Sequence, residues 1–129
     1  MNDRSALSRM PLYRHLDRID RGLAAQGIGP GDAIPPDALF RLDQWHYHGT
    51  GAIRAAATFL GLGPASRVLD VGAGVGGPAR FLAHATGCRV TAVELQSELD
   101  AVGRDLTRRC GLASRVEHVC GDAVAVPLP

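Results

Sequence analysis

The sequence predicts an α/β fold in which a parallel sheet is built from a Rossmann-like βαβαβ unit, preceded by helices. The run at 67–71 is short, apolar and β-branched, as expected of a strand covered on both faces; a second buried strand is expected at 89–93 and a third strand at 114–120. Helical periodicity fills the two intervals between these runs, and glycines crowd residues 72–77 directly after the first run. Strands that alternate with helices at this spacing are typical of parallel sheets with right-handed crossovers.

Composition limits the classes of function. Hydrophobic residues make up 46% of the 129 residues, which favours a globular chain of one domain at most. Fourteen basic and 13 acidic residues give a net charge of +1, so nothing indicates a nucleic-acid or anionic-membrane partner. The three cysteines form no Cys-x-x-Cys pair, and no apolar run approaches a membrane span. We therefore expect a cytoplasmic protein with a small-molecule substrate and no metal site.

The first half of the chain predicts helices that cover the sheet. Apolar residues recur at helical spacing on one face between Pro11 and Gly27, and a short helix is expected from Pro35. Thr50 is the expected N-cap of a third helix that ends at Gly61. The apolar residues expected on the inner faces of the first and third helices are Leu12, Leu16, Ile19 and Leu23, and Ile53, Ala56, Ala57 and Leu60.

Rings are concentrated between the second and third of these helices. Residues 43–50 contain the only tryptophan, Tyr47, His46 and His48. Two histidines two residues apart make a poor metal site without further ligands. The stretch either plugs the edge of the core or forms a wall or lid over a bound small molecule, since such pockets combine aromatic walls with a few polar tips.

Carboxylates mark the ends of all three predicted strands. Asp70 lies at the end of the first strand, Glu94 follows the second, and Asp122 follows the third. Ligands of open α/β sheets bind beyond the carboxyl ends of the strands. Because a buried unpaired carboxylate is costly, the requirements of the core alone do not explain three acids at this edge.

The glycine pattern by itself leaves the cofactor open. Gly72, Gly74 and Gly77 satisfy Gly-x-Gly-x-x-Gly, and Glu94 follows at about the spacing of a dinucleotide ribose acid. An NAD(P)- or FAD-binding Rossmann fragment of an oxidoreductase is therefore one alternative, and a non-catalytic binding or interaction module is another. Asp70 just before the turn favours a ligand with an ammonium or sulfonium group over a pyrophosphate.

Four segments together resemble class I S-adenosylmethionine-dependent methyltransferases. Residues 68–83 resemble the first motif of that family, residues 90–96 the second-strand motif and residues 116–128 the third. Residues 43–49 are similar to the segment that precedes the core in small-molecule methyltransferases of the sarcosine/dimethylglycine, tocopherol and sterol type. The resemblance implies S-adenosyl-L-methionine as cofactor and methyl transfer to a nitrogen, carbon or oxygen of a small molecule.

The resemblance also implies roles for individual residues. The glycine turn would pass close to the methionine part of the cofactor, with Asp70 orienting its polar end and Glu94 accepting hydrogen bonds from the ribose hydroxyls. Leu95 or Gln96 would pack on the adenine, and Asp122 and the Ala123 N–H would contact its edge. The full set of implied cofactor-binding residues is Asp70, Gly72, Ala73, Gly74, Glu94, Leu95, Gln96, Asp122, Ala123 and, more loosely, Tyr47 and His48. No catalytic base is assigned, and His46 and His48 are the candidates for one.

The family's sheet has seven strands in the order 3-2-1-4-5-7-6, and this sequence supplies three. We therefore expect a helical cover or lid at residues 1–62 and a partial cofactor-binding core at 63–129, truncated before strands 4–7. Strand 1 should lie at an open edge, to be completed by a second chain or by a C-terminal half. Such a chain is expected to bind the cofactor weakly and to have no turnover alone.

Overall fold

A single parallel sheet lies at the centre of the structure. The computed structural model describes residues 16–128, and within them the strands are β1 (Arg67–Val71), β2 (Arg89–Glu94) and β3 (Val116–Cys120). Their order is β1-β2-β3, and both neighbouring pairs are parallel, with Val68 opposite Val90 and Val90 opposite Val116. The predicted Rossmann-like βαβαβ arrangement, with strand 1 at an edge, is confirmed.

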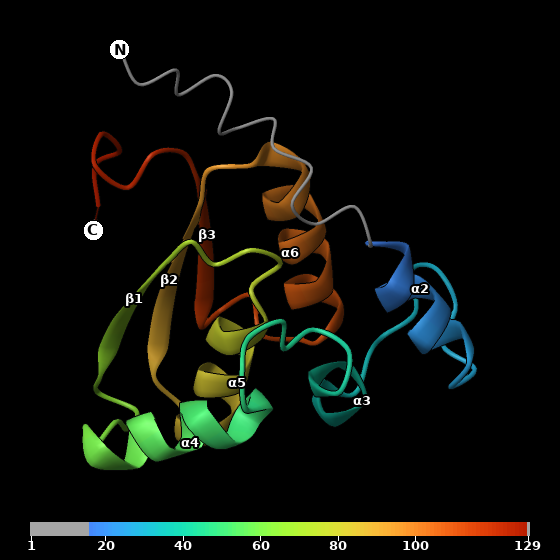
Figure 1. Ribbon diagram of the computed structural model, residues 1–129, viewed down its shortest axis with the longest axis horizontal. Helices are drawn as coiled ribbons and strands as arrows, with labels where there is room; N and C mark the ends of the chain where they lie inside the picture. The colour runs from blue at the N-terminus through green and yellow to red at the C-terminus, as the bar shows by residue number, and fades with distance from the viewer. Residues whose placement is uncertain (1–15, 129) are drawn as a thin grey trace.

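Two helices cover one face of this sheet. Helix α5 (Gly77–Thr86) follows β1 and helix α6 (Ser97–Arg109) follows β2, and both lie on the same side (Figure 1). Helix α5 ends before Gly87, which takes a positive φ of 76° that favours glycine. The apolar core fills the space between the sheet and these helices, where Ala79, Cys88 and Ala92 are completely buried. The glycine turn, which joins β1 to α5, is held in place at the edge of this core, where its residues Ala73 and Val75 are buried.

The opposite face of β1 is open. Leu69 and Val71 are 47% and 60% exposed, and no helix covers that face in the part of the chain that the structure describes (Figure 1). The expectation that this strand is covered on both faces is therefore wrong for residues 16–128. Side chains of a strand alternate between the two faces, so Leu69 and Val71 share the open one while Val68 and Asp70 point toward the helices.

The N-terminal helices pack around α5 and α6. Helix α2 (Asp17–Ala24) buries Ile19 and Leu23, as its periodicity predicts, whereas the predicted start at Pro11 lies outside the described residues. Helix α3 (Pro36–Phe40) and helix α4 (Gly49–Phe59) both contact α5, and Phe40 meets Phe81 edge to face with ring centroids 5.2 Å apart. The first half of the chain is thus joined to the core through α5, and through hydrogen bonds between residues 29–34 and Arg109 of α6.

The predicted details of α4 are partly wrong. His48, in the left-handed conformation with φ 67°, precedes the helix, so Thr50 lies inside the first turn and is not the N-cap. Of the four residues expected on the inner face, Ala57 is buried, whereas Ala56 and Leu60 are exposed. Helix α6 begins at Ser97, and Gln96 precedes it without a side-chain cap.

Candidate functional site

The glycine turn between β1 and α5 has two parts with different surroundings. Gly72 and Gly74 have φ values of 74° and 57°, and a Cβ added to either would meet no heavy atom within 4 Å. Their backbone therefore faces open space in a conformation that favours glycine. Gly76 and Gly77 are packed inside, because a Cβ on Gly76 would approach the His118 ring to 2.8 Å and one on Gly77 would overlap the carbonyl oxygen of Asp43. A ligand can reach the front of the turn and not its back.

Hydrogen bonds hold the front of the turn against the end of β2. The backbone N–H groups of Gly72 and Ala73 both donate to the carbonyl oxygen of Val93, at 2.9 and 3.0 Å. The Gly74 N–H donates to the Glu94 carboxylate at 2.8 Å. The turn is therefore organised before any ligand arrives.

Asp70 is the unpaired acid of this site. Its Oδ2 atom is buried and has no hydrogen-bond partner among the described residues. Burial, and then the nearby Glu94 carboxylate, raise the pKa of Asp70, while His46 acts in the opposite direction. An orphaned buried carboxylate oxygen is costly, so its position at the mouth of the glycine turn indicates a cationic or hydrogen-bond-donating ligand.

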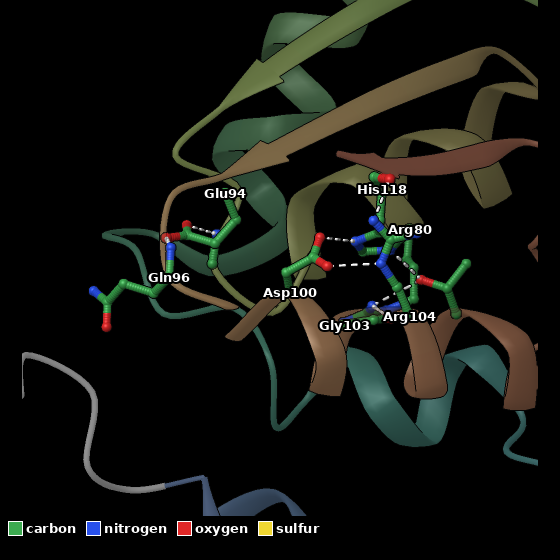
Figure 2. A network of polar contacts seen from close by, with 9 residues as sticks. Arg80, Glu94, Gln96, Asp100, Gly103, Arg104 and His118 are labelled. Carbon is green, nitrogen blue, oxygen red and sulfur yellow. Dashed lines mark hydrogen bonds and ion pairs between the residues drawn. The ribbon is translucent and has the colours of Figure 1, made fainter. Parts of the chain in front are cut away.

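Glu94 joins the turn to the second strand. Besides the bond from Gly74, its other oxygen accepts the N–H of Gln96 at 2.9 Å, as Figure 2 shows for the Glu94–Gln96 contact. Glu94 as a whole residue is only 7% exposed. A carboxylate has about four acceptor positions, so both oxygens keep a free lone pair. Glu94 thus supports the glycine turn, a role that sequence reasoning missed.

The remaining residues expected at the strand ends lie at the same edge of the sheet. Gly121 N–H donates to the carbonyl oxygen of Glu94 at 2.8 Å, which places Asp122 and Ala123 beside the end of β2. Asp122 Oδ1 accepts the N–H of Val124 at 2.9 Å. Leu95 is 37% exposed, so part of its apolar side chain is free to contact a ligand.

The residues of the aromatic segment differ in their exposure and in their contacts. Tyr47 is 91% exposed, and His48 is exposed at the start of α4. His46 is partly buried and interacts electrostatically with Asp70. Its Nε2 lies 2.9 Å from Gln44 Oε1 and its Nδ1 lies 3.1 Å from the carbonyl oxygen of Tyr47. The structure therefore brings His46 and Gln44 to the site edge and leaves Tyr47 at the surface.

A buried ion pair lies beneath the turn, and sequence reasoning missed it entirely. Asp43 and Arg80 have side chains with no exposed surface, and Arg80 Nη2 donates to Asp43 Oδ2 at 3.0 Å. Arg80 Nη1 also donates to Gly103 O and to Thr107 Oγ1 (Figure 2). One signal was present in the sequence: Arg80 interrupts the apolar start of α5, Pro78-Ala79-Arg80-Phe81-Leu82.

A second buried group, His118, continues this cluster on β3. Its Nε2 lies 2.8 Å from Thr107 Oγ1, and Asp100 lies nearby with its own partner, Arg104 (Figure 2). Burial first, and then the Arg80 guanidinium, lower the pKa of His118 to about 4. Because Arg80 donates to Thr107, the threonine hydroxyl donates onward to the neutral imidazole.

Metal and membrane signals are absent from the described residues. Among residues 16–128, no three His, Cys, Asp or Glu side chains are grouped to hold a metal ion. None of the helices in that range is long and apolar enough to cross a bilayer.

Comparisons with known proteins agree with the geometry. Residues 68–129 match the family model described as a methyltransferase domain. A sterol 24-C-methyltransferase from Eremothecium gossypii is 44% identical over 62 residues, which are 48% of this chain and 17% of that protein. A sarcosine/dimethylglycine N-methyltransferase from Halorhodospira halochloris is 45% identical over 58 residues, 45% of this chain and 21% of that protein.

A solved structure shares the fold. The geranyl diphosphate C-methyltransferase from Streptomyces coelicolor, in complex with Mg2+, geranyl diphosphate and S-adenosyl-L-homocysteine, superposes with a TM-score of 0.57 and 22% identity, over 71% of this chain and 33% of that one. This chain thus spans a third or less of each of these three proteins. The matched region contains the glycine turn, Glu94 and Asp122. Residues 68–129 thus match the model of the methyltransferase domain family, the class that the sequence motifs of this chain resemble.

Proposed function

We propose that this chain is the cofactor-binding part of an S-adenosyl-L-methionine-dependent methyltransferase that acts on a small-molecule acceptor. The observation that carries the proposal is the buried, unpartnered Oδ2 of Asp70 at the mouth of a glycine turn. A cofactor with an ammonium group would supply the missing partner. A pyrophosphate would place further negative charge beside Asp70 and Glu94, which disfavours the dinucleotide alternative.

The other residues fit the same cofactor. Gly72 and Gly74 leave open space in front of the turn, and Glu94 holds that turn in place through Gly74 while keeping lone pairs for ribose hydroxyls. We place the adenine between Leu95 or Gln96 and the Asp122–Ala123 backbone, which lies beside the end of β2. His46 takes the position at the polar end that the resemblance gives to Tyr47 and His48, since both of these are exposed.

Bound S-adenosyl-L-methionine supplies a methyl group that its sulfonium already makes electrophilic. The chain's own residues therefore need only to bind and orient the cofactor and to exclude water from it. The acceptor is proposed as a small molecule because the matched relatives are named for sterols and for sarcosine and dimethylglycine. The acceptor atom, nitrogen, carbon or oxygen, stays open, and no base is assigned.

Calorimetric titration of the 129-residue chain tests the proposal. S-adenosyl-L-homocysteine and S-adenosyl-L-methionine should bind, and NAD+ and FAD should not. Asp70→Asn should weaken the affinity for both adenosyl ligands by about tenfold, the worth of one charge-assisted contact of about 1.4 kcal/mol. The matched control is Glu117→Gln, which neutralises an exposed carboxylate on β3 and should leave binding unchanged. Binding of a dinucleotide in preference to the adenosyl ligands would contradict the proposal.

A further inference from the structure

A continuous path of hydrogen bonds links the interior of the protein to the edge of the candidate site. It begins at Arg80, whose Nη2 lies 3.0 Å from Asp43 Oδ2. Gln44 Nε2 donates to the other Asp43 oxygen at 3.0 Å, and Gln44 Oε1 lies 2.9 Å from His46 Nε2. His46 in turn interacts electrostatically with Asp70, the unpaired acid of the site. The hydrogen bonds therefore connect helix α5 to His46 through Asp43 and Gln44, and His46 lies near enough to Asp70 to interact with it electrostatically.

The inner end of this path is held firmly. Arg80 is completely buried and donates three hydrogen bonds, two of them to Gly103 and Thr107 of helix α6. Burial raises the pKa of Asp43 and lowers that of Arg80, so keeping both groups charged here is costly. A buried ion pair of this kind adds little net stability to a protein. In some other proteins such a pair selects one conformation over its alternatives.

The packing around Gly77 shows how the segment that contains Asp43 lies against helix α5. Gly77, the first residue of α5, has no room for a Cβ, because that atom would overlap the carbonyl oxygen of Asp43 and approach Gln44 Nε2 to 3.0 Å. Asp43 and Gln44 are thus pressed against the back of the glycine turn, whose front faces open space. Trp45, the only tryptophan, lies in this segment and donates from Nε1 to Leu42 O at 2.9 Å.

We propose that the Asp43–Arg80 pair is a positioning device that sets residues 43–48 as a wall of the cofactor site, so that cofactor affinity depends on it. Asp43 and Arg80 act through Gln44 and His46 and do not touch the cofactor. The ligand class is the charged amino-acid end of an adenosyl cofactor, which Asp70 and His46 face. This inference rests on the proposed function, and its test separates the two.

The test compares two buried carboxylates that each pair with an arginine. Asp43→Asn removes the charge that holds residues 43–48, whereas Asp100→Asn removes the partner of Arg104 and leaves that segment untouched. Calorimetric titration with S-adenosyl-L-homocysteine should show at least a tenfold loss of affinity for Asp43→Asn and less than a twofold change for Asp100→Asn. Trp45 emission should respond to the ligand in the wild type and in Asp100→Asn over the same concentration range.

A second variant guards against loss of folding. Gln44→Leu keeps the ion pair and cuts the path between Asp43 and His46, so it should retain the thermal midpoint and still lose affinity at least threefold. Equal affinities for the wild type, Asp43→Asn and Gln44→Leu would overturn the positioning role, and so would equal losses for Asp43→Asn and Asp100→Asn.

A measurement without ligand distinguishes failure of the positioning role from failure of the proposed function. If the wild type binds no adenosyl ligand, the proposed function is wrong, and acrylamide quenching of Trp45 then decides the positioning role alone. Quenching that rises in Asp43→Asn and not in Asp100→Asn supports it. Quenching that is equal in the two variants overturns it.

Discussion

Individual residues at the carboxyl ends of β1 and β2 are suited to binding a ligand and do not stabilise the ligand-free protein. Asp70 shows this most clearly, because burial and Glu94 raise its pKa while its buried oxygen has no partner among the described residues. Strained or unsatisfied groups of this kind cluster at functional sites. A group that is kept there to bind a ligand lowers the free energy of unfolding of the ligand-free protein.

Asp70→Asn should therefore stabilise the ligand-free chain while weakening cofactor binding. A raised pKa means that the folded state disfavours the ionised form, so the wild type loses stability as the pH rises through that pKa, and the variant does not. We expect the variant to gain about 0.5–2 kcal/mol in free energy of unfolding at pH 7.5. Thermal denaturation at pH 7.5 and pH 5 measures this, and the gain should shrink at the lower pH. A loss of stability at pH 7.5 would show that Asp70 has a stabilising partner.

His118 should make the fold sensitive to acid. Its pKa of about 4 in the folded protein lies below the ordinary 6.5, so the unfolded chain binds the proton first as the pH falls. Its contribution to stability is complete above about pH 6.5 and disappears toward pH 4, roughly 3 kcal/mol in all. Urea unfolding between pH 7.5 and 4.5 should show a flatter pH dependence for His118→Asn than for the wild type. His84→Gln, which changes an exposed histidine, is the control and should keep the wild-type slope.

Some residues of the candidate site can be predicted from the sequence, and others cannot. Asp70, Glu94 and Asp122 are visible because each follows an apolar strand, and strand ends of parallel sheets meet at one edge. The Asp43–Arg80 pair is not visible, because 37 residues separate its members and only the packing of α3 and α5 brings them together. The support that Glu94 gives to Gly74 depends on a turn geometry that composition does not specify.

At the scale of elements, helix α5 connects the two halves of the chain. It contacts α3, α4 and β2, and its first residue, Gly77, touches the backbone of Asp43. The strands and the ends of α5 were predictable because apolar runs and glycines mark them strongly. The start of α4 was not, since the left-handed conformation of His48 depends on how the aromatic segment enters the helix.

Gly77→Ala should disrupt this junction. The added methyl group overlaps a backbone oxygen that cannot rotate away, so residues 43–48 or the start of α5 must move. We expect a loss of about 1–3 kcal/mol, the usual cost of overpacking, and a weaker response of Trp45 fluorescence to ligand. Gly51→Ala is the matched control, because Gly51 lies inside α4 with open space around it and gains up to about 1 kcal/mol of helix propensity. Urea denaturation followed by circular dichroism compares the two, and equal effects would contradict the packing argument.

At the scale of the whole molecule, the sheet has an open side. Leu69 and Val71 expose apolar surface on the edge strand β1, and Phe59, at the end of the neighbouring α4, is 90% exposed. Edge strands with exposed apolar side chains are templates for pairing with another chain. The position of β1 at the edge follows the strand order that the family resemblance implies.

The 129-residue chain should therefore self-associate, and Leu69→Lys should reduce that association. A charge on the edge strand opposes strand-to-strand pairing without entering the core, since Leu69 lies on the open face. Light scattering after size exclusion, across a tenfold range of protein concentration, measures the effect. Glu117→Lys, which adds a lysine at an exposed position of β3, is the control and should leave association through β1 in place. A wild-type chain that stays monomeric throughout would contradict this expectation.

An adenosyl cofactor should bind at the carboxyl ends of β1 and β2. Backbone amide NMR of the chain during titration with S-adenosyl-L-homocysteine tests it most directly. The largest shifts should fall on residues 70–76, 94–96 and 121–123, with a second group at residues 43–48. Amides at the opposite ends of the strands, Arg67, Arg89 and Arg115, should stay in place. Shifts concentrated at those arginines, or spread evenly over the chain, would contradict the proposed site.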